Sequence, residues 1–385
     1  MHILEIPSFF PPYGGWFCLD QAKALKALGH EVRILSNVQL GASVGLRDFL
    51  KLPYGRFEHE MSGITIYQSY QRGLPKAIRY NVDRWVSIVQ SMFKDYIARY
   101  GCPQLLHAHC AKWAGYAAML ISKAHGIPYV ITEHLPLMLL EDEFGKAPST
   151  AWQIPLLKQT YELADRVIPV SEELVDDIAC YYGKTYRWQY VSNTIDTDFF
   201  HYQRREPRSG RAFRFCCLAD YYYRKGYDVL FEAMRQLQQS GVSIELHIAG
   251  LFTDSRACRT AIENLGLKDV TCYGRLDKKG VRDLLYRADA LVLASRSEVQ
   301  PLVLLEAMST GIPVVSTECV PRCQRLSGCT IVPIGDAEAL SQAMLQVADR
   351  TESDRKQYSE QVSQLASPDI VGRQLEAIFN EIVKS

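Results

Sequence analysis

The sequence has no excess of charge of either sign, because 43 lysines and arginines balance 43 aspartates and glutamates over 385 residues. A protein without a global field does not attract a polyanion through its overall charge, which argues against nucleic acid as a partner. Any anion that this chain binds must be held by local groups.

Long apolar runs are also missing. No stretch approaches the ~18 to 20 apolar residues that a membrane-spanning helix needs. Residues 1–7 carry no basic segment ahead of their short apolar run, which favours a buried first strand over a signal peptide. We therefore expect a cytoplasmic protein, with any membrane contact being peripheral and on the inner face.

The eleven cysteines form neither a metal-binding nor a disulfide pattern. No CxxC pair occurs, and Cys319 and Cys323, four residues apart, have no matching second pair. Because the others are scattered through strand-like and helical stretches, we interpret them as reduced thiols in the core of a cytosolic protein.

What the sequence does contain is enough apolar material for two cores, since 48% of its residues are hydrophobic. Short apolar runs alternate with amphipathic helical stretches, which is typical of doubly wound α/β units with parallel sheets. Strands are expected at residues 3–6, 32–35, 105–106, 129–132, 166–170 and 188–191, and then at 213–218, 244–249, 270–273, 290–293 and 313–316.

A polar segment with Pro207 and Gly210, residues 201–211, is the candidate linker between two domains. The predicted N-terminal domain covers residues 1–200 and the predicted C-terminal domain covers 212–367. Residues 368–385, with a helix expected over 370–383, follow the last strand signal.

The most informative segment follows the strand expected at 290–293. Glu298 lies in the loop after that strand, and Glu306 lies in a short helix that begins after Pro301. Open α/β sheets bind ligands at this edge, and amide groups at a helix N-terminus, here Leu302, Val303 and Leu304, attract a diphosphate. Glu306 would then accept hydrogen bonds from ribose hydroxyls, and Glu298 would reach a sugar. Two isolated glutamates could equally be surface residues, so the surrounding motifs decide.

Arg224, Lys225 and Gly226 stand between the strand at 213–218 and a helix expected over 227–238. A departing nucleoside diphosphate develops negative charge that a metal or fixed cations must stabilise. Lys225 is the candidate cation, although a lone lysine at a helix start is often only an exposed charge.

Short motifs occur in a fixed order along nearly the whole chain. They are Tyr13-Gly14-Gly15, Gly29-His30-Glu31-Val32, Leu106-His107-Ala108-His109, Thr132-Glu133-His134, Ala164-Asp165-Arg166-Val167, Asn193-Thr194-Ile195-Asp196, Lys225-Gly226, Tyr273-Gly274-Arg275-Leu276 and Tyr286-Arg287-Ala288-Asp289. With the E-x7-E run from Glu298 to Val315, the sequence resembles the family 4 glycosyltransferases.

This resemblance implies a GT-B fold, in which two Rossmann-like domains face each other across a cleft and the C-terminal one holds the donor. The segment 368–385 would cross back to the first domain. It also implies a retaining transfer, without metal or other cofactor, from a nucleotide sugar, with UDP favoured. The acceptor would be a glycan or a lipid-linked saccharide, as in polysaccharide or glycoconjugate synthesis.

The resemblance also assigns roles to residues. Glu306 would bind ribose, Glu298 the transferred sugar and Lys225 the diphosphate, with the nucleobase near Arg275 and Leu276. On the first domain, the Gly14-Gly15 turn would approach the donor phosphates and His109 would point at the reacting sugar. Glu133 and His134 are candidates for the acceptor side.

Two departures from the family pattern affect the donor site. Asp220 stands where many members have an arginine, so a second cation must come from Arg224 or from elsewhere, such as Arg296. The usual glycine-containing stretch after the first glutamate is Val299-Gln300-Pro301 here, which limits backbone freedom. Asp196-Thr197-Asp198 imitates a metal-binding DxD motif but is interpreted as a turn, so no metal is predicted.

A segment from Arg72 to Tyr100 places seven apolar residues on one face, with Lys76, Arg79 and Arg84 nearby. It is either a helix packed on the first domain or a membrane-surface element that presents a lipid-linked acceptor.

Two other classes of function were considered. A dinucleotide-dependent oxidoreductase requires G-x-G-x-x-G after the first strand, whereas Gly14-Gly15 stands alone here. A non-catalytic or sugar-binding relative on the same scaffold is the stronger alternative, supported by Asp220 and by the altered loop after Glu298.

Overall fold

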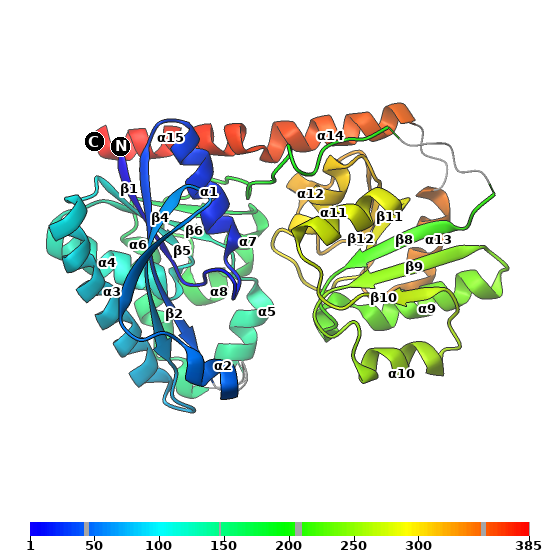
Figure 1. The fold of residues 1–385 in the computed structure, drawn as a ribbon, viewed down its shortest axis with the longest axis horizontal. Coiled ribbons are helices and arrows are strands. Elements are labelled where there is room, and N and C mark those ends of the chain that lie inside the picture. The colour runs from blue at the N-terminus through cyan, green and yellow to red at the C-terminus, as the bar shows by residue number, and fades with distance from the viewer. Residues whose placement is uncertain (42–45, 146–147, 205–209, 348–351, 385) are drawn as a thin grey trace. The chain divides into compact units, whose positions relative to one another are not determined.

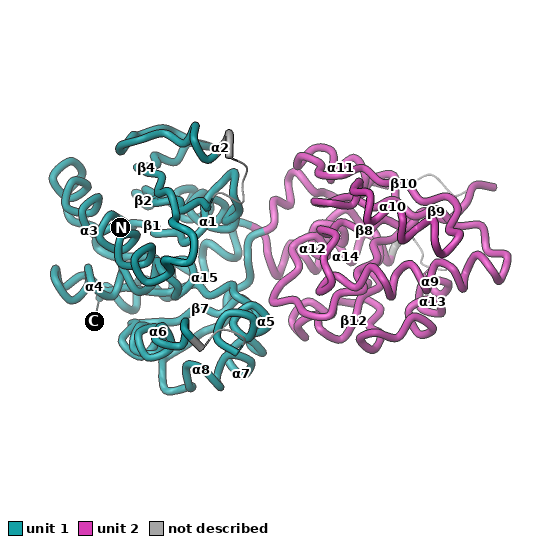
Figure 2. Tube along the Cα trace, turned by 90° about the horizontal axis from the view of Figure 1, so that it is seen from below, with its two compact units in different colours: residues 1–194, 368–385 teal, residues 195–367 magenta. Residues whose placement is uncertain are grey.

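The computed structural model describes residues 1–41, 46–145, 148–204, 210–347 and 352–384. The chain divides into two compact units, which Figure 2 shows in different colours. Unit 1 comprises residues 1–194 and 368–385, and unit 2 comprises residues 195–367. Each unit is an α/β layer structure around a mainly parallel sheet.

Among the described residues, unit 1 has a seven-stranded sheet in the order β3-β4-β2-β1-β5-β6-β7, parallel except for β3 against β4. Its strands are β1 (His2–Pro7), β2 (Glu31–Leu40), β3 (Arg56–Met61), β4 (Ile64–Arg72), β5 (Leu105–His109), β6 (Tyr129–Glu133) and β7 (Arg166–Pro169). Its helices are α1 (Trp16–Ala27), α2 (Leu46–Lys51), α3 (Ile78–Tyr100), α4 (Tyr116–His125), α5 (Leu137–Leu140), α6 (Gln153–Glu162), α7 (Glu173–Asp177), α8 (Ala179–Tyr182) and α15 (Pro368–Lys384).

The hairpin of β3 and β4 was not predicted. Its turn residues Ser62 and Gly63 have φ of 52° and 78°, as a two-residue type I′ turn requires. The strand β4 lacks a continuous apolar run because it buries polar side chains that bond to polar side chains of β2. For example, Ser69 Oγ donates to Asn37 Oδ1 at 2.9 Å. The strand expected at 188–191 was wrong, since Trp188 makes only an isolated bridge to Val167.

The segment 72–100 contains the helix α3, and most of its apolar face is buried. Trp85, Val89, Met92 and Phe93 are buried, and Trp85 Nε1 donates to the carbonyl oxygen of Asn37 at 2.6 Å. The face that would have to touch a membrane is therefore packed inside unit 1, so that argument for a membrane-surface helix was wrong. No described helix is long and apolar enough to cross a bilayer.

The helix α15 completes the core of unit 1. Leu375 and Phe379 are fully buried among residues of the N-terminal strands and of α1. Gly372 allows the close approach, because a Cβ there would lie 3.2 Å from the carbonyl oxygen of Ala24 in α1. Figure 1 shows α15 alongside α1.

Within the described residues, unit 2 has a six-stranded parallel sheet in the order β10-β9-β8-β11-β12-β13. Its strands are β8 (Phe213–Leu218), β9 (Ile244–Ala249), β10 (Val270–Cys272), β11 (Ala290–Leu293), β12 (Val314–Thr317) and β13 (Cys329–Val332), the last of which was not predicted. Its helices are α9 (Tyr227–Gln239), α10 (Arg256–Asn264), α11 (Lys278–Arg287), α12 (Leu302–Ser309), α13 (Ala337–Gln346) and α14 (Glu352–Ala366).

Counted within unit 2, this strand order is 3-2-1-4-5-6, the order of the Rossmann fold. The order reverses between β8 and β11, and ligands of such sheets bind outside the carboxyl ends of the strands at that point. The loops after β8 and β11 are therefore the first place to look for a site.

The boundary between the units lies earlier than we expected. Residues 195–204, which we assigned to the first domain and the linker, belong to unit 2. The amide of Ile195 donates to Ala366 at 2.8 Å, and Phe200 is buried in the core of unit 2. The rest of the proposed linker includes residues 205–209, which lie outside the described residues.

All eleven cysteines are free thiols. Seven are buried or lie within strands, including the adjacent pair Cys216 and Cys217 of β8.

Candidate active site

Lys225 and Glu298 meet at the switch point of unit 2. Lys225 follows β8 and Glu298 follows β11, and Lys225 Nζ donates to Glu298 Oε1 at 2.5 Å. Ser295 Oγ donates to the same oxygen at 2.7 Å. The two charged side chains are only 15% and 7% exposed, so the pair is largely withdrawn from water. The sequence placed both residues at this sheet edge but did not predict that they bind each other.

A glycine lets these two loops come together. Gly226 has φ of +67°, and a Cβ at this position would lie 1.8 Å from the carbonyl oxygen of Ala294. No other residue fits such a contact without moving the backbone. The amide of Arg296 then donates to the carbonyl oxygen of Arg224 at 2.7 Å, which fastens the two loops to each other.

The two candidates for a second cation, Arg296 and Arg224, differ in their contacts. Arg296 makes a bidentate pair with Asp228, at 2.8 and 2.6 Å, and its guanidinium lies over the ring of Tyr223. The hydrogen bond from Arg296 is the main cause that lowers the pKa of Asp228. Arg224 lies 3.9 Å from Glu298 Oε2 and forms no bidentate pair with a carboxylate in the described part of the chain, so it is the better placed of the two.

The helix α12 begins as expected, at Leu302 after Pro301. The first amide groups of a helix have no acceptor within the helix, and here they belong to Leu302 and Val303, whose side chains are half-buried. Glu306, one turn further along, is also half-buried. Val299, which replaces a glycine of the family pattern, is buried.

Asp220 has a structural place. Its Oδ1 accepts a hydrogen bond from the amide of Leu251 at 2.8 Å, which ties the loop after β8 to the loop after β9. At the same junction, a Cβ on Gly250 would lie 2.2 Å from the carbonyl oxygen of Ala219. The acid thus replaces the family's arginine in a position where it holds two loops together.

The remaining residues predicted for the nucleotide follow β10. Gly274 takes a positive φ of 68°, and after it Arg275 is exposed while Leu276 packs partly against the core. Asp196, the first acid of the DxD-like segment, accepts from the amide of Phe199 at 3.1 Å and pairs with Lys278. It forms a turn, as predicted.

In unit 1, the turn after β1 is also built around glycine. Gly14 and Gly15 have φ of 105° and 75°, and a Cβ on Gly15 would lie 1.9 Å from the carbonyl oxygen of Phe9. The helix α1 begins directly afterwards, at Trp16. The two glycines therefore place the N-terminus of α1 at the carboxyl edge of the unit 1 sheet, beside the end of β1.

His109 lies at the same sheet edge, but its side chain is fully buried. Its Nε2 donates to Glu5 Oε2 at 2.8 Å, and His107 Nδ1 lies 2.9 Å from the same oxygen. Burial and the neighbouring His107 lower the pKa of His109 to about 4. Burial opposes ionisation of Glu5, but the two imidazoles outweigh it and lower the pKa of Glu5 to about 2.

Glu133 and His134 differ from each other in their surroundings. The buried carboxylate of Glu133 accepts from the amides of Ala111, His134 and Leu135, and from Tyr161 Oη at 2.5 Å. These contacts hold the loops after β5 and β6, so Glu133 does not present its carboxylate to an acceptor as we expected. His134 is half-buried and stacks on Phe17, with ring centroids 3.7 Å apart.

One group of side chains in the described residues has the composition of a metal site: Glu5, His107 and His109. Both imidazole nitrogens lie at hydrogen-bond distance from one carboxylate oxygen. A transition metal needs each nitrogen at about 2.0–2.1 Å from the ion itself, so an ion would have to displace these contacts. The arrangement fits a hydrogen-bonded cluster.

Glu5 and Ser295 are the residues that sequence reasoning missed. Glu5 did carry a signal, because a carboxylate inside the apolar run Ile3-Leu4-Glu5-Ile6 must find partners if the run is a buried strand. Ser295 carried none, since a serine in a loop is ordinary.

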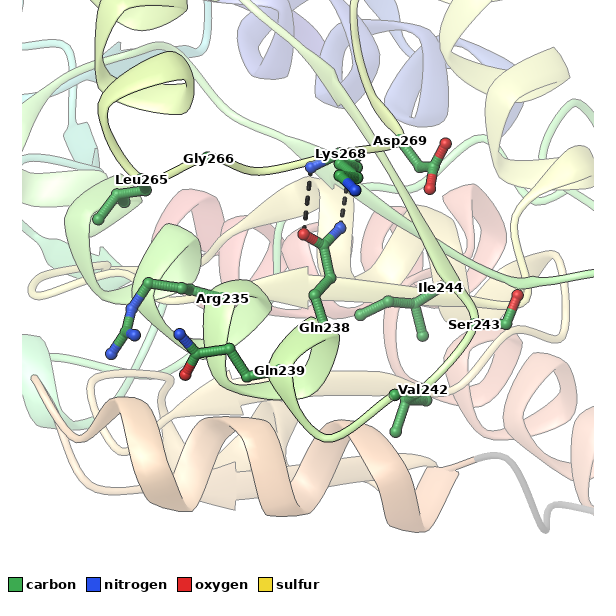
Figure 3. A pocket seen from close by; sticks show the side chains of 11 residues that line it. Arg235, Gln238, Gln239, Val242, Ser243, Ile244, Leu265, Gly266, Lys268 and Asp269 are labelled. Carbon is green, nitrogen blue, oxygen red and sulfur yellow. Dashed lines mark hydrogen bonds between the residues drawn. The ribbon is translucent and has the colours of Figure 1, made fainter.

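A hollow of about 380 Å³ lies elsewhere in unit 2, between the end of α9 and the start of β9 (Figure 3). The side chain of Gln238 bridges there to the backbone of Lys268. Because this hollow lies at the amino ends of the strands, it is separate from the switch point.

Comparison with known proteins agrees with this geometry. The profile "Glycosyltransferase Family 4" matches residues 14–199, and the profile "Glycosyl transferases group 1" matches residues 212–350. The putative teichuronic acid biosynthesis glycosyltransferase TuaC of Bacillus subtilis is 27% identical over 83% of this chain and 81% of its own length. The putative colanic acid biosynthesis glycosyltransferase WcaL of Salmonella typhimurium is 32% identical over 48% of this chain and 49% of its own length.

Solved structures show the same fold. Sucrose-phosphate synthase from Thermosynechococcus elongatus superposes with a TM-score of 0.78 at 18% identity, and both chains are covered in full. HepE from Anabaena, solved in complex with UDP and glucose, has a TM-score of 0.71 at 14% identity, covering 99% of this chain and all of its own. The profile matches and the two Rossmann-like units together show that this chain is a glycosyltransferase of family 4 with the GT-B fold.

Proposed function

We propose that this enzyme transfers a sugar from a nucleotide sugar, UDP-sugar in the first instance, to a saccharide acceptor with retention of the anomeric configuration. The observation that carries the proposal is the pairing of Lys225 with Glu298 at the switch point, next to the N-terminus of α12. The complex of HepE with UDP and glucose supports the choice of nucleotide.

The departing diphosphate would be stabilised by fixed positive groups. Lys225, Arg224 and the first amides of α12 lie at one sheet edge, and none needs a metal to act on phosphate oxygens. Glu306 would hold the ribose hydroxyls, with Arg275 and Leu276 near the base. The proposal therefore includes transfer without metal or other cofactor.

Glu298 would contact the transferred sugar while it shares Lys225 with the diphosphate. The acceptor hydroxyl would attack on the face that the diphosphate leaves, and a phosphate oxygen would take the hydroxyl proton. The carboxylate is already held by Ser295 and Lys225 before any ligand arrives, so little reorganisation accompanies binding.

The acceptor would be a glycan or lipid-linked saccharide in polysaccharide synthesis, as the names of TuaC and WcaL suggest. Peripheral membrane contact is proposed for exposed side chains of residues 50–80, since the apolar face of α3 is buried except at Ile78. Leu50, Tyr54, Leu74, Ile78 and Tyr80 are exposed large side chains of unit 1. The guanidinium of Arg72 lies 3.9 Å from the ring centre of Tyr54, which adds positive charge to this surface.

The alternative of a non-catalytic relative has less support, because Asp220 has a structural role in joining two loops and Val299 is buried.

A thermal-shift panel of UDP-, GDP- and ADP-sugars tests the proposal, because a bound donor raises the melting temperature by mass action. The donor that gives the largest shift is then incubated with saccharide acceptors in EDTA, and the anomeric configuration of the product is read by NMR. A shift with UDP-sugars and an α-linked product from an α-linked donor are expected. An inverted product, or loss of activity in EDTA, would overturn the mechanism.

A further inference from the structure

We propose that Glu5 is a positioning residue whose carboxylate fixes the protonated nitrogen of His109 and, through it, that of His134, leaving His134 Nδ1 as an acceptor for a saccharide hydroxyl. The part that concerns the saccharide rests on the proposed function. The part that concerns the protons rests on unit 1 alone.

The chain of contacts begins at Glu5, whose side chain is fully buried in the central strand β1. Its ionisable neighbours are the imidazoles of His107 and His109 on the adjacent strand β5, both of which contact Oε2. No lysine or arginine forms an ion pair with it among the described residues. An ionised carboxylate only accepts hydrogen bonds, so His109 Nε2, which bonds to Glu5 Oε2, carries the hydrogen. The lowered pKa of Glu5 agrees with this state.

The state of the far nitrogen of His109 follows from this arrangement. In a neutral imidazole one nitrogen donates and the other accepts. His107 Nε2 lies 2.6 Å from Thr132 Oγ1, and its Nδ1 is near Glu5 without forming a hydrogen bond to it, so His109 alone links Glu5 to His134. His109 holds its hydrogen on Nε2, so its Nδ1 is an acceptor.

His134 is the third ring in the chain. Its Nε2 lies 3.4 Å from His109 Nδ1, so Nε2 must carry the hydrogen that His109 accepts. Phe17 stacks on one face of the ring, with an interplanar angle of 21°, and limits its rotation. The remaining nitrogen, Nδ1, is buried and has no hydrogen-bond partner in the described part of the chain.

A buried acceptor without a partner is costly unless a ligand supplies a donor. His134 follows β6 at the carboxyl edge of the unit 1 sheet, the edge where open α/β sheets bind ligands. An imidazole nitrogen without hydrogen can accept a hydrogen bond but cannot donate one. It therefore binds an O–H group and does not bind a second acceptor such as a phosphate oxygen. A saccharide hydroxyl has the required chemistry. Glu5 thereby acts at a distance, through the orientation of two rings.

The proton positions are read directly from long-range ¹H–¹⁵N NMR of protein labelled with ¹⁵N-histidine. In the unaltered enzyme at pH 7, we expect Nε2–H in both His109 and His134. Nδ1–H in His134, or a charged His109, would overturn the proposal whatever the enzyme's activity. This measurement needs no variant and no ligand.

Glu5→Gln is the matching variant, because the amide keeps the shape and removes the charge. We expect mixed tautomers of His109 and His134, and a fall in kcat of roughly tenfold with little change in the KM of the nucleotide sugar. Asp165→Asn is the control, since Asp165 bonds the amide of Tyr129 at the other end of β6. Tautomers unchanged in Glu5→Gln would refute the role of Glu5, whereas altered tautomers with unchanged kcat would refute only its link to the saccharide.

Discussion

Lys225 and Glu298 are 73 residues apart in the sequence and form an ion pair at 2.5 Å, each on the loop of one of the two strands that flank the switch point. Their opposite charges compensate each other. A diphosphate bound as we propose would share Lys225 with Glu298, while Ser295 continues to hold the carboxylate.

Lys225→Met leaves the carboxylate of Glu298 largely buried without its nearest cation. We expect a destabilisation of about 2 kcal/mol and a loss of at least about 100-fold in kcat/KM. The double variant Lys225→Met with Glu298→Gln should recover part of the melting temperature but none of the activity. Equal melting temperatures in the single and double variants would show that the pair has no energetic coupling.

Gly226→Ala should disrupt the junction of the two loops. The added methyl group would lie 1.8 Å from the carbonyl oxygen of Ala294, so the backbone must shift, whereas Gly241 has a similar positive φ and nothing within 4 Å. Gly241→Ala should therefore cost only the conformational strain of about 1 kcal/mol. Melting temperature and donor binding of the two variants are compared, and similar losses would contradict the close approach.

Arg224→Ala and Arg296→Ala should have different effects. Arg224 is the proposed second cation for the diphosphate, so its loss should raise the KM for the nucleotide sugar about tenfold. Arg296 is bound to Asp228, so its loss should lower stability by about 1 kcal/mol with a smaller change in KM. Steady-state kinetics and thermal melts distinguish the two variants. A larger rise in KM for Arg296→Ala than for Arg224→Ala would show that Arg296 is the second cation.

Glu306→Ala should weaken binding of the nucleotide through loss of contacts with ribose. If the carboxylate accepts from the ribose hydroxyls, UDP and 2′-deoxy-UDP should bind the variant equally, while the unaltered enzyme prefers UDP by about tenfold. Calorimetric titration measures both ligands. If the variant still preferred UDP over 2′-deoxy-UDP, residues other than Glu306 would bind the ribose hydroxyls.

The cluster around Glu5 should make unit 1 sensitive to acid. His109 has its pKa lowered from 6.5 to about 4, so between these values the unfolded chain binds more protons and stability falls as pH falls. Glu5, lowered from 4.5 to about 2, adds a further loss below pH 4.5. The free energy of unfolding, measured by urea titration between pH 7 and 4, should fall by up to about 1.4 kcal/mol per pH unit for one such group. His109→Gln should flatten this slope, and an unchanged slope would contradict the buried neutral imidazole.

The sequence was sufficient for most of unit 2. Its strands are short apolar runs, its helices amphipathic, and Gly226 and Pro301 mark helix starts that the structure has at Tyr227 and Leu302. The hairpin of β3 and β4 could not be found in this way, because Ser69 and its neighbours satisfy their polar groups against residues far along the chain.

The site was predictable in position but not in contacts. Strand ends and helix starts are local properties, so Lys225, Glu298 and Glu306 could be assigned to one sheet edge. That Lys225 pairs with Glu298, or that Glu133 holds backbone amides, depends on distances between loops that no local pattern contains.

The place of α15 in the core of unit 1 has a consequence for how the protein is made. Leu375 and Phe379 leave the ribosome after all of unit 2, so the N-terminal 194 residues wait with an incomplete core while residues 195–367 are synthesised. At 5–20 residues per second this delay is on the order of ten seconds or more. The groove that α15 will fill is exposed to chaperones throughout that interval, and unit 2 has time to fold before the unit that precedes it.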